Sequence, residues 1–297
     1  MAKKLLFLYN PFAGQGKIKT HLSDVLDIFT KGGYQVTVRP TQSVGDAQKF
    51  ISRHGKSYEC VVVSGGDGTF SEGVNGVMQI AKERRPALGY LPAGTVNDFA
   101  NSLNISKNPI EAAKAIVNQN EVYCDFGVAD DHYFSYVAAF GAFTEVSYTT
   151  PQNQKNVFGQ LAYFLNGIQH LSMLQTYYLR GAYDDIAFEG DFIYGMLSNS
   201  YSVGGFKGFT GKDVSLNDGL LEMMLIQSPQ DIGQLNEILL ALIMGNFDAC
   251  KLITTKKVKS LHITCEAPVA FTFDGEDGGK HTDISFSVLH DEVKLYV

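Results

Sequence analysis

Three glycines surround one aspartate directly after an apolar run in the stretch VVVSGGDGTFSEGVNGV, residues 61–77. The continuous valines are typical of a strand that is buried on both faces of a parallel sheet. A helix is predicted to begin just after the glycines Gly65, Gly66 and Gly68. Such a turn lets backbone N–H groups approach an anion closely, and the helix N-terminus adds positive partial charge. The stretch therefore predicts a phosphate site around Asp67.

Strands and helices alternate through the first 120 residues. Strands are predicted at residues 5–9, 34–39, 60–63 and 87–91, and the first of them is expected to be buried. One amphipathic helix covers residues 22–29 and stops at Gly32-Gly33, and a second covers Val44 to His54. Two short helical stretches follow residue 91. This βαβα order predicts a parallel sheet with helices on both faces.

The pattern changes after about Cys124, where polar and apolar residues alternate. Strands of this kind are predicted at residues 132–140, 176–183, 192–200, 220–226, 260–264, 269–273, 284–289 and 293–297. Helices interrupt them at residues 158–174 and 232–247. We expect an α/β domain over residues 1–123 and a mostly antiparallel, β-sandwich-like domain over residues 124–297. The last strand is free to return to the first domain.

Two more polar, glycine-rich stretches follow predicted strands: NPFAGQGK after the first and LPAGTVNDFA after the fourth. In an open parallel sheet such loops lie together at the carboxyl ends of the strands, where ligands bind. The P-loop signature is absent, because Pro11 stands at its first glycine and Ile18 at its Ser or Thr. No G-x-G-x-x-G opens a helix either. Taken alone, any one of these turns reads as a tight loop without a ligand.

Five carboxylates accompany these loops: Asp67, Asp98, Asp125, Asp274 and Glu276. A phosphate site lined with carboxylates needs a divalent cation to offset the repulsion, and Mg²⁺ is the usual bridge. Each carboxylate also has a structural interpretation. Asp67 and Asp125 could stabilise turns, the latter at the end of the strand EVYCD; Asp98 could cap a helix. Glu276 could lie at a solvated hairpin tip.

The bulk composition excludes several classes of protein. A formal net charge of −7 argues against nucleic-acid binding and against permanent adhesion to an anionic membrane, although a local basic patch could act there. The four cysteines form no C-x-x-C pair, so neither a zinc site nor a disulfide framework is expected. No apolar run has the length of a membrane span, and the first one is too short for a signal peptide. We expect a cytoplasmic protein.

The chain resembles the soluble lipid kinases of the diacylglycerol kinase family, which includes sphingosine kinases and is distantly similar to NAD kinases and phosphofructokinases. Eight motifs in the family's order carry the resemblance: NPFAG (10–14), GGDGTFSEGVNG (65–76), LPAGTVNDFA (91–100), CDFG (124–127), GQLAYFLNGI (159–168), SNSYSVGG (198–205), LNDGLLE (216–222) and DGE (274–276). The resemblance covers nearly the whole chain. It implies an NAD kinase/phosphofructokinase-like first domain and an active site in the cleft between the domains.

The resemblance also implies a role for individual residues. ATP would be surrounded by Asn10, Pro11, Phe12, Ala13, Gly14, Thr41, Gly65, Gly66, Asp67, Gly68, Thr69, Phe70, Ser71 and Thr95. Asp67 would support the catalytic Mg²⁺, and Asp98 and Asp125 would complete a network of carboxylates and waters around it. Glu276 looks like the general base, with Asp274 as a metal-network or positioning residue.

A second, structural Mg²⁺ is implied at Asp218 and the backbone carbonyls near Ser215 and Leu220. Here the chain departs from the family, because the segment FTGKDVSLNDG lacks the proline that members carry before this element. Backbone-carbonyl ligation depends on the shape of the loop. The missing proline therefore puts this site in doubt.

The function implied is transfer of the γ-phosphate of ATP to the hydroxyl of diacylglycerol, which gives phosphatidic acid. The alternatives are an NAD kinase-like phosphotransferase and a catalytically silent lipid- or nucleotide-binding protein. The sequence does not identify which lipid is phosphorylated, and it leaves open whether the chain forms a homodimer. Transient contact with the inner membrane surface is expected. Three features could contact the membrane or bind the lipid; alternatively, they could belong to the core or to the solvated surface. They are Tyr163 and Phe164, the segment LNEILLALIMGNF (235–247), and the lysines Lys251, Lys256, Lys257 and Lys259.

Overall fold

The computed structural model describes residues 3–141, 174–200, 202–203, 206–207 and 215–297. The expected helix over residues 158–174, with Tyr163 and Phe164, lies outside the described residues except for its last position. The chain divides into two compact units, which we describe separately. The first unit comprises Met1–Asp125 and His290–Val297, and the second comprises Phe126–Leu289.

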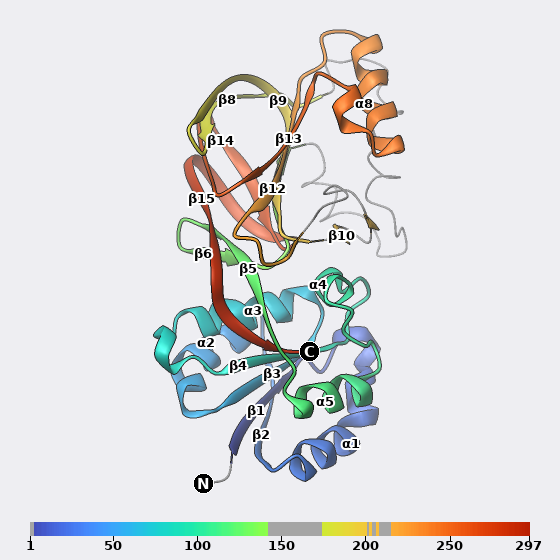
Figure 1. The fold of residues 1–297 in the computed structure, drawn as a ribbon, viewed down its shortest axis with the longest axis vertical. Helices are drawn as coiled ribbons and strands as arrows, with labels where there is room; N and C mark the ends of the chain where they lie inside the picture. Colours follow the sequence, from blue (N-terminus) through green and yellow to red (C-terminus); the bar gives the residue numbers. More distant parts are fainter. Residues whose placement is uncertain (1–2, 142–173, 201, 204–205, 208–214) are drawn as a thin grey trace. The chain divides into compact units, whose positions relative to one another are not determined.

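The first unit contains parallel strands in the order β2-β1-β3-β4 (Figure 1). Their bounds are β1 (Lys3–Tyr9), β2 (Tyr34–Pro40), β3 (Cys60–Gly65) and β4 (Ala87–Pro92). Every residue of β3 and β4 is buried, as expected for strands covered on both faces. The end of β15 (Glu276–Tyr296) pairs in parallel with β4, where Leu295 lies beside Leu88.

Two pairs of helices pack on opposite faces of these strands (Figure 1). One pair is α1 (Lys17–Lys31) and α5 (Pro109–Asn118), and the other is α2 (Asp46–His54) and α3 (Asp67–Met78). Short elements complete the unit: η1 (Ala13–Gly16), η2 (Gly55–Ser57), η3 (Lys82–Arg84) and α4 (Asp98–Ser102). The first helix begins at Lys17, five residues before the apolar periodicity, and ends at the predicted Gly32.

The described residues of the second unit form antiparallel strands, as predicted, and the helix α8 (Ile232–Met244). Its strands are β6 (His132–Phe134), β7 (Val137–Gly141), β8 (Tyr177–Tyr183), β9 (Ile186–Ser198), β10 (Ser202–Val203), β11 (Phe206–Lys207), β12 (Leu221–Gln227), β13 (Ile253–Val258) and β14 (Ser260–Phe273). β5 (Glu121–Ala129) and β15 run through both units. β7 and β8 each pair with both β9 and β14, so these four strands close a ring.

Several predicted strands are joined or divided in the structure. The segments 260–264 and 269–273 form the single strand β14, which bends where its register with β15 shifts between Thr264 and Val269. The segments 284–289 and 293–297 likewise belong to β15. In contrast, the predicted strand 132–140 is divided into β6 and β7, because the N–H groups between them bond to a side chain instead of a neighbouring strand.

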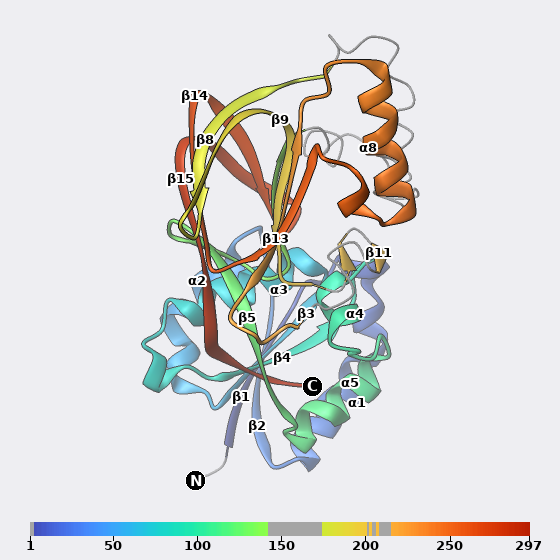
Figure 2. The ribbon, with the colours of Figure 1, turned by 45° about the horizontal axis from the view of Figure 1, so that its top comes forward.

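The helix α8 (Ile232–Met244) packs one face on the strands β7, β9, β12 and β13 (Figure 2). It ends three residues earlier than predicted, because Gly245 adopts the left-handed conformation (φ 63°) that closes a helix. A short 3-10 turn, η5 (Phe247–Ala249), follows it. The other face of the strands carries a second apolar cluster, which includes Phe140, Leu197 and Phe271.

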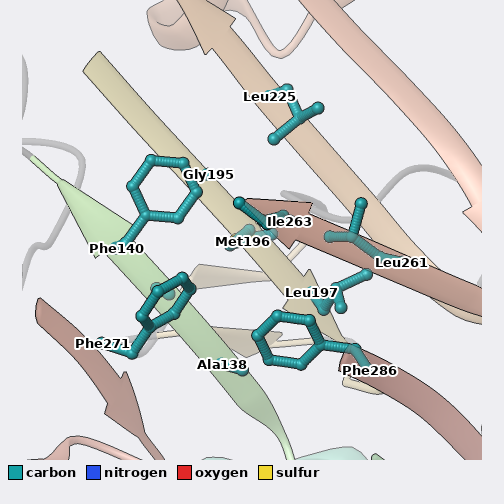
Figure 3. A pocket seen from close by; sticks show the side chains of 11 residues that line it. Ala138, Phe140, Gly195, Met196, Leu197, Leu225, Leu261, Ile263, Phe271 and Phe286 are labelled. Carbon is teal, nitrogen blue, oxygen red and sulfur yellow. The ribbon is translucent and has the colours of Figure 1, made fainter. Parts of the chain in front are cut away.

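A small pocket lies within this second cluster (Figure 3). Its lining is apolar and includes Phe140, Leu225 and Phe286. Its volume of about 10 Å³ has room for roughly one water molecule. An acyl chain would need a far larger cavity, so this pocket is a packing gap in the core.

Candidate active site

The loops after β1, β3 and β4 meet backbone to backbone in the first unit. A Cβ atom on Gly14 would overlap the carbonyl oxygen of Ala93, and one on Gly94 would lie 2.6 Å from the Cα of Gly66. The Ala93 N–H donates to the Gly65 carbonyl at 2.7 Å. Only residues without side chains allow so close an approach. The three glycine-rich loops predicted from the sequence are therefore assembled at one edge of the sheet.

Backbone hydrogen bonds extend the strands into these loops. The Asn10 N–H donates to the Ser64 carbonyl at 2.8 Å, and the Thr41 N–H donates to the Tyr9 carbonyl at 2.9 Å. The Asn10 side chain accepts the N–H of Phe12 at 2.9 Å, which fixes the first loop as a turn. Phe12 is 82% exposed, so its ring is available to a ligand. Asn10, Phe12 and Thr41 thus lie at the carboxyl ends of β1 and β2.

The N-terminus of α3 opens at this junction. Asp67 is the first residue of α3, and no described side chain caps the helix. The first N–H groups of an α-helix have no partner within the helix, so they are donors for an anion. Gly65 is required because a Cβ there would overlap the side chain of Thr69, and both residues are buried. Gly66, Asp67 and Gly68 are half-buried and form the accessible part of the turn.

Asn97 organises the loop after β4, and the sequence analysis did not single it out. It is buried in the left-handed conformation (φ 55°) directly before α4. Its Oδ1 accepts the Gly94 N–H at 2.9 Å and the Tyr90 hydroxyl at 3.2 Å, and its Nδ2 donates to the Gly94 carbonyl at 2.8 Å. Asparagine tolerates positive φ, which was the available signal. Thr95, expected to contact ATP, is exposed in this loop.

A buried aromatic group lies beneath the junction. The Phe70 ring lies between Tyr90 at 4.7 Å and Phe99 at 4.1 Å, measured between ring centroids. Burial, and to a lesser extent the charge of Asp67, raises the pKa of Tyr90 well above its ordinary value. The Phe70 side chain is fully buried, so any contact of this residue with ATP must come from its backbone. Ser71 and Thr69 are also buried.

The predicted metal-network carboxylates do not form a direct coordination shell. No group of three His, Cys, Asp or Glu residues within the described part of the chain could hold a metal ion. Asp98 is 2% exposed at the first position of α4. Asp125 is fully buried inside β5, and not at the end of a strand as predicted; its Oδ1 lies 2.6 Å from Nδ1 of His290. His290 is not among the site residues expected from the sequence.

A catalytic Mg²⁺ nevertheless fits the donor set around Asp67. Mg²⁺ keeps several waters and is usually bound through one or two carboxylates plus substrate phosphates. A single half-buried carboxylate beside the N–H groups of a helix N-terminus supplies what such an ion needs from the protein.

Asp274 and Glu276 flank a tight hairpin turn in the second unit. Asp274 (φ 52°) and Gly275 (φ 81°) both have positive φ, as in a type I′ turn, and join β14 to β15. The buried Asp274 carboxylate accepts the N–H groups of Ser135, Tyr136 and Val137 at 2.8, 2.9 and 3.2 Å, and the Ser135 hydroxyl at 2.8 Å. Four protein donors favour the positioning role of Asp274 over the metal role. Glu276 is exposed beside it.

The proposed structural-metal site is occupied by a protein cation. Asp218 Oδ1 accepts the Leu220 N–H at 3.2 Å, and Asp218 Oδ2 lies 2.7 Å from Nζ of Lys257. Ser215 is half-buried at the start of this segment. With both carboxylate oxygens engaged in this way, the arrangement does not fit a divalent cation.

The apolar helix of the second unit is only partly covered. Leu240, Ile243 and Met244 of α8 are 55%, 65% and 74% exposed, whereas Leu235 and Ile238 are buried in the core. The helix is therefore both a packed element and an exposed apolar surface. Among the described residues no helix is long and apolar enough to span a membrane.

Comparisons with known proteins agree with one another. Residues 4–129 match the family described as the diacylglycerol kinase catalytic domain. A diacylglycerol kinase of Staphylococcus saprophyticus is 32% identical over 94% of this chain and 91% of its own, and one of Staphylococcus aureus is 32% identical over 94% and 88%. The crystal structure of a protein proposed to be a diacylglycerol kinase, from Bacillus anthracis, superposes with a TM-score of 0.83 at 27% identity, covering 99% of this chain and 95% of the other.

Proposed function

Because the chain belongs to the diacylglycerol kinase family, we propose that it transfers the γ-phosphate of ATP to the hydroxyl of diacylglycerol, giving phosphatidic acid. The observation that carries the proposal is the junction of three glycine loops at the N-terminus of α3, with Asp67 as its first residue. Backbone donors and one carboxylate there suit a metal-bound triphosphate.

ATP is held by the first unit in this proposal. The N–H groups of Gly66, Gly68 and Thr69 approach its phosphates, and Phe12 and Thr41 lie along the rest of the nucleotide. Asp67 would hold Mg²⁺. Asp98 and Asp125 would act through ordered waters, because no group of three metal-ligating side chains lies together among the described residues. When bound, Mg²⁺ neutralises charge on the transferred phosphoryl group.

Glu276 is the general base. It accepts the proton of the lipid hydroxyl as that oxygen forms a bond to the γ-phosphorus and the bond from this phosphorus to the bridging oxygen of ADP breaks. Asp274 positions the hairpin that carries Glu276. The reaction requires Glu276 to reach the γ-phosphate of the bound ATP.

The test is an assay with γ-labelled ATP and diacylglycerol in mixed micelles, with NAD and other hydroxyl lipids as alternative acceptors. We expect labelled phosphatidic acid, and Glu276→Gln should lower kcat by about 10²–10⁴-fold with unchanged thermal stability, because the side chain is exposed. The matched control Asp277→Asn, one residue away and also exposed, should retain activity. Label in NAD alone would establish the NAD kinase alternative, and no label in any acceptor would favour the silent binding protein.

Transient contact with the membrane that contains the substrate is assigned to α8. Its exposed Leu240, Ile243 and Met244 form an apolar surface suited to the interface of a bilayer. Replacing Leu240 and Ile243 by serine should weaken sedimentation with phospholipid vesicles, whereas Asn236→Ser on the exposed side of the same helix should not. Activity on a short-chain, water-dispersed diacylglycerol should stay normal in both variants. Equal vesicle binding by all three proteins would remove α8 from the contact.

A further inference from the structure

Lys257 joins two carboxylates in the second unit. Its Nζ lies 2.7 Å from Oδ2 of Asp218 and 3.9 Å from Oε1 of Glu222. The backbone fixes this arrangement, because Lys257 on β13 is the direct cross-strand partner of Glu222 on β12. The cation is therefore set by the register of two antiparallel strands, and not only by a flexible side chain at the surface.

Glu222 explains why a cation is needed here. Its side chain is only 6% exposed, and a buried carboxylate is costly unless a positive charge accompanies it. Asp218 adds a second negative charge at the mouth of the same site, with its side chain 26% exposed. Two carboxylates close together require a counter-ion, which the ammonium group of Lys257 supplies.

We propose that Lys257 replaces the structural divalent cation implied for the Ser215–Leu220 segment. Asp218 Oδ1 accepts the Leu220 N–H at 3.2 Å, which shapes the turn, and Oδ2 binds the ammonium group, which ties the turn to β13. A divalent ion bound to the same carboxylate would meet the positive charge of Lys257 at close range. The site is therefore a built-in ammonium site that holds the turn without metal, independently of the metal that accompanies ATP.

The missing proline agrees with this inference. Carbonyl ligation of a metal depends on a fixed loop shape, and the segment before Asn217-Asp218 lacks the residue that restricts its backbone. A salt bridge to a neighbouring strand requires less of the loop's backbone conformation to be fixed than carbonyl ligation does, because only the Asp218 carboxylate and one N–H must be in place.

The test is thermal unfolding of the full chain without nucleotide, in Mg²⁺, in Ca²⁺ and in EDTA. We expect one midpoint for the wild type in all three buffers. Lys257→Met should lower the midpoint by roughly 5 °C in EDTA, and Mg²⁺ should restore part of the loss, since Asp218 and Glu222 have then lost the positive charge of Lys257. The matched control Lys256→Met, exposed on the same strand, should behave as the wild type. Lys257→Arg keeps the cation and should show no response to metal.

The wild type, Asp218→Asn and Asp67→Asn can overturn the proposal without the Lys257→Met variant. If Mg²⁺ raises the midpoint of the wild type, and Asp218→Asn abolishes the rise while Asp67→Asn keeps it, the segment binds metal and Lys257 does not replace it. Equilibrium dialysis with Mn²⁺ gives a second measurement in case Lys257→Met fails to fold. Asp218→Asn should then leave the number of ions bound by the chain unchanged; loss of one bound ion would contradict the proposal.

Discussion

Asp274→Asn isolates the role of the Asp274 carboxylate in the hairpin that carries Glu276. The asparagine keeps the shape and tolerates the positive φ of 52°. Its amide nitrogen, however, must face an N–H donor whichever way the group turns, because Ser135 donates to one oxygen and Tyr136 and Val137 donate to the other. The side chain is therefore forced into a donor-to-donor contact.

The cost follows from these contacts. If the amide turns toward Ser135, one buried N–H loses its acceptor, which costs roughly 1–3 kcal/mol, and the remaining bonds lose their ionic character. We expect the free energy of unfolding to fall by about 3 kcal/mol in total. At about 1.4 kcal/mol per factor of ten, the amides of Ser135, Tyr136 and Val137 should exchange with solvent about a hundredfold faster.

Urea unfolding and hydrogen exchange measure the two effects. Asp277→Asn is the control: its exposed Oδ1 accepts the nearby Gly279 N–H, so its cost should stay within about 0.5 kcal/mol. Both measurements are made without Mg²⁺. If Asp274→Asn unfolds within 0.5 kcal/mol of the wild type yet its activity requires more Mg²⁺, Asp274 belongs to the metal network and the positioning argument is wrong.

Two further predictions concern the first unit. Gly66→Ala should keep normal stability, because its Cβ would meet Gly94 Cα at an ordinary 3.4 Å. The same methyl group should raise KM for ATP about tenfold, because it would lie where a phosphate approaches. Gly94→Ala should instead lower the free energy of unfolding in urea by about 1–3 kcal/mol, since its Cβ would lie 2.6 Å from Gly66 Cα. Hydrogen bonds from Lys82 and Arg85 lower the pKa of Glu292 below its ordinary 4.5, so this ion pair stabilises the folded protein above that pH and ceases to do so as pH falls through the folded-state value. Glu292→Gln should therefore cost about 1 kcal/mol at pH 7 and nothing in strong acid, and an equal cost at both would contradict the pair's role.

The sequence predicted features that depend on local chemistry. Glycines that follow apolar runs located the loop junction, because close backbone approach is possible only for residues without side chains. A hairpin tip was the structural interpretation offered for Glu276, and the structure has a tight hairpin turn at Asp274 and Gly275 directly before it. Confirmed as well are the α/β character of the N-terminal part and the antiparallel strands that follow it.

Features that depend on distant partners were not predictable from one sequence. A charged Asp125 suggested the end of a strand, but β5 continues to Ala129, and the carboxylate is met by His290, which lies far along the chain. The break between β6 and β7 likewise follows from Asp274, which takes up the N–H groups there. The pairing of Lys257 with Glu222 required the register of β12 and β13, which the alternation of side chains alone does not fix.

The return of β15 to β4 makes the nucleotide-binding part inseparable from the rest of the chain. Residues 4–129 match a named catalytic domain, yet that stretch lacks Leu295 and Tyr296, which pair with β4, and Glu292, which neutralises Arg85. Cutting it out would leave an unpaired strand edge open to association with other chains. During synthesis the edge of β4 stays unpaired until roughly 200 further residues have been made, because its partner is the end of β15. The pairing of β15 with β4 is therefore a late, long-range event in folding.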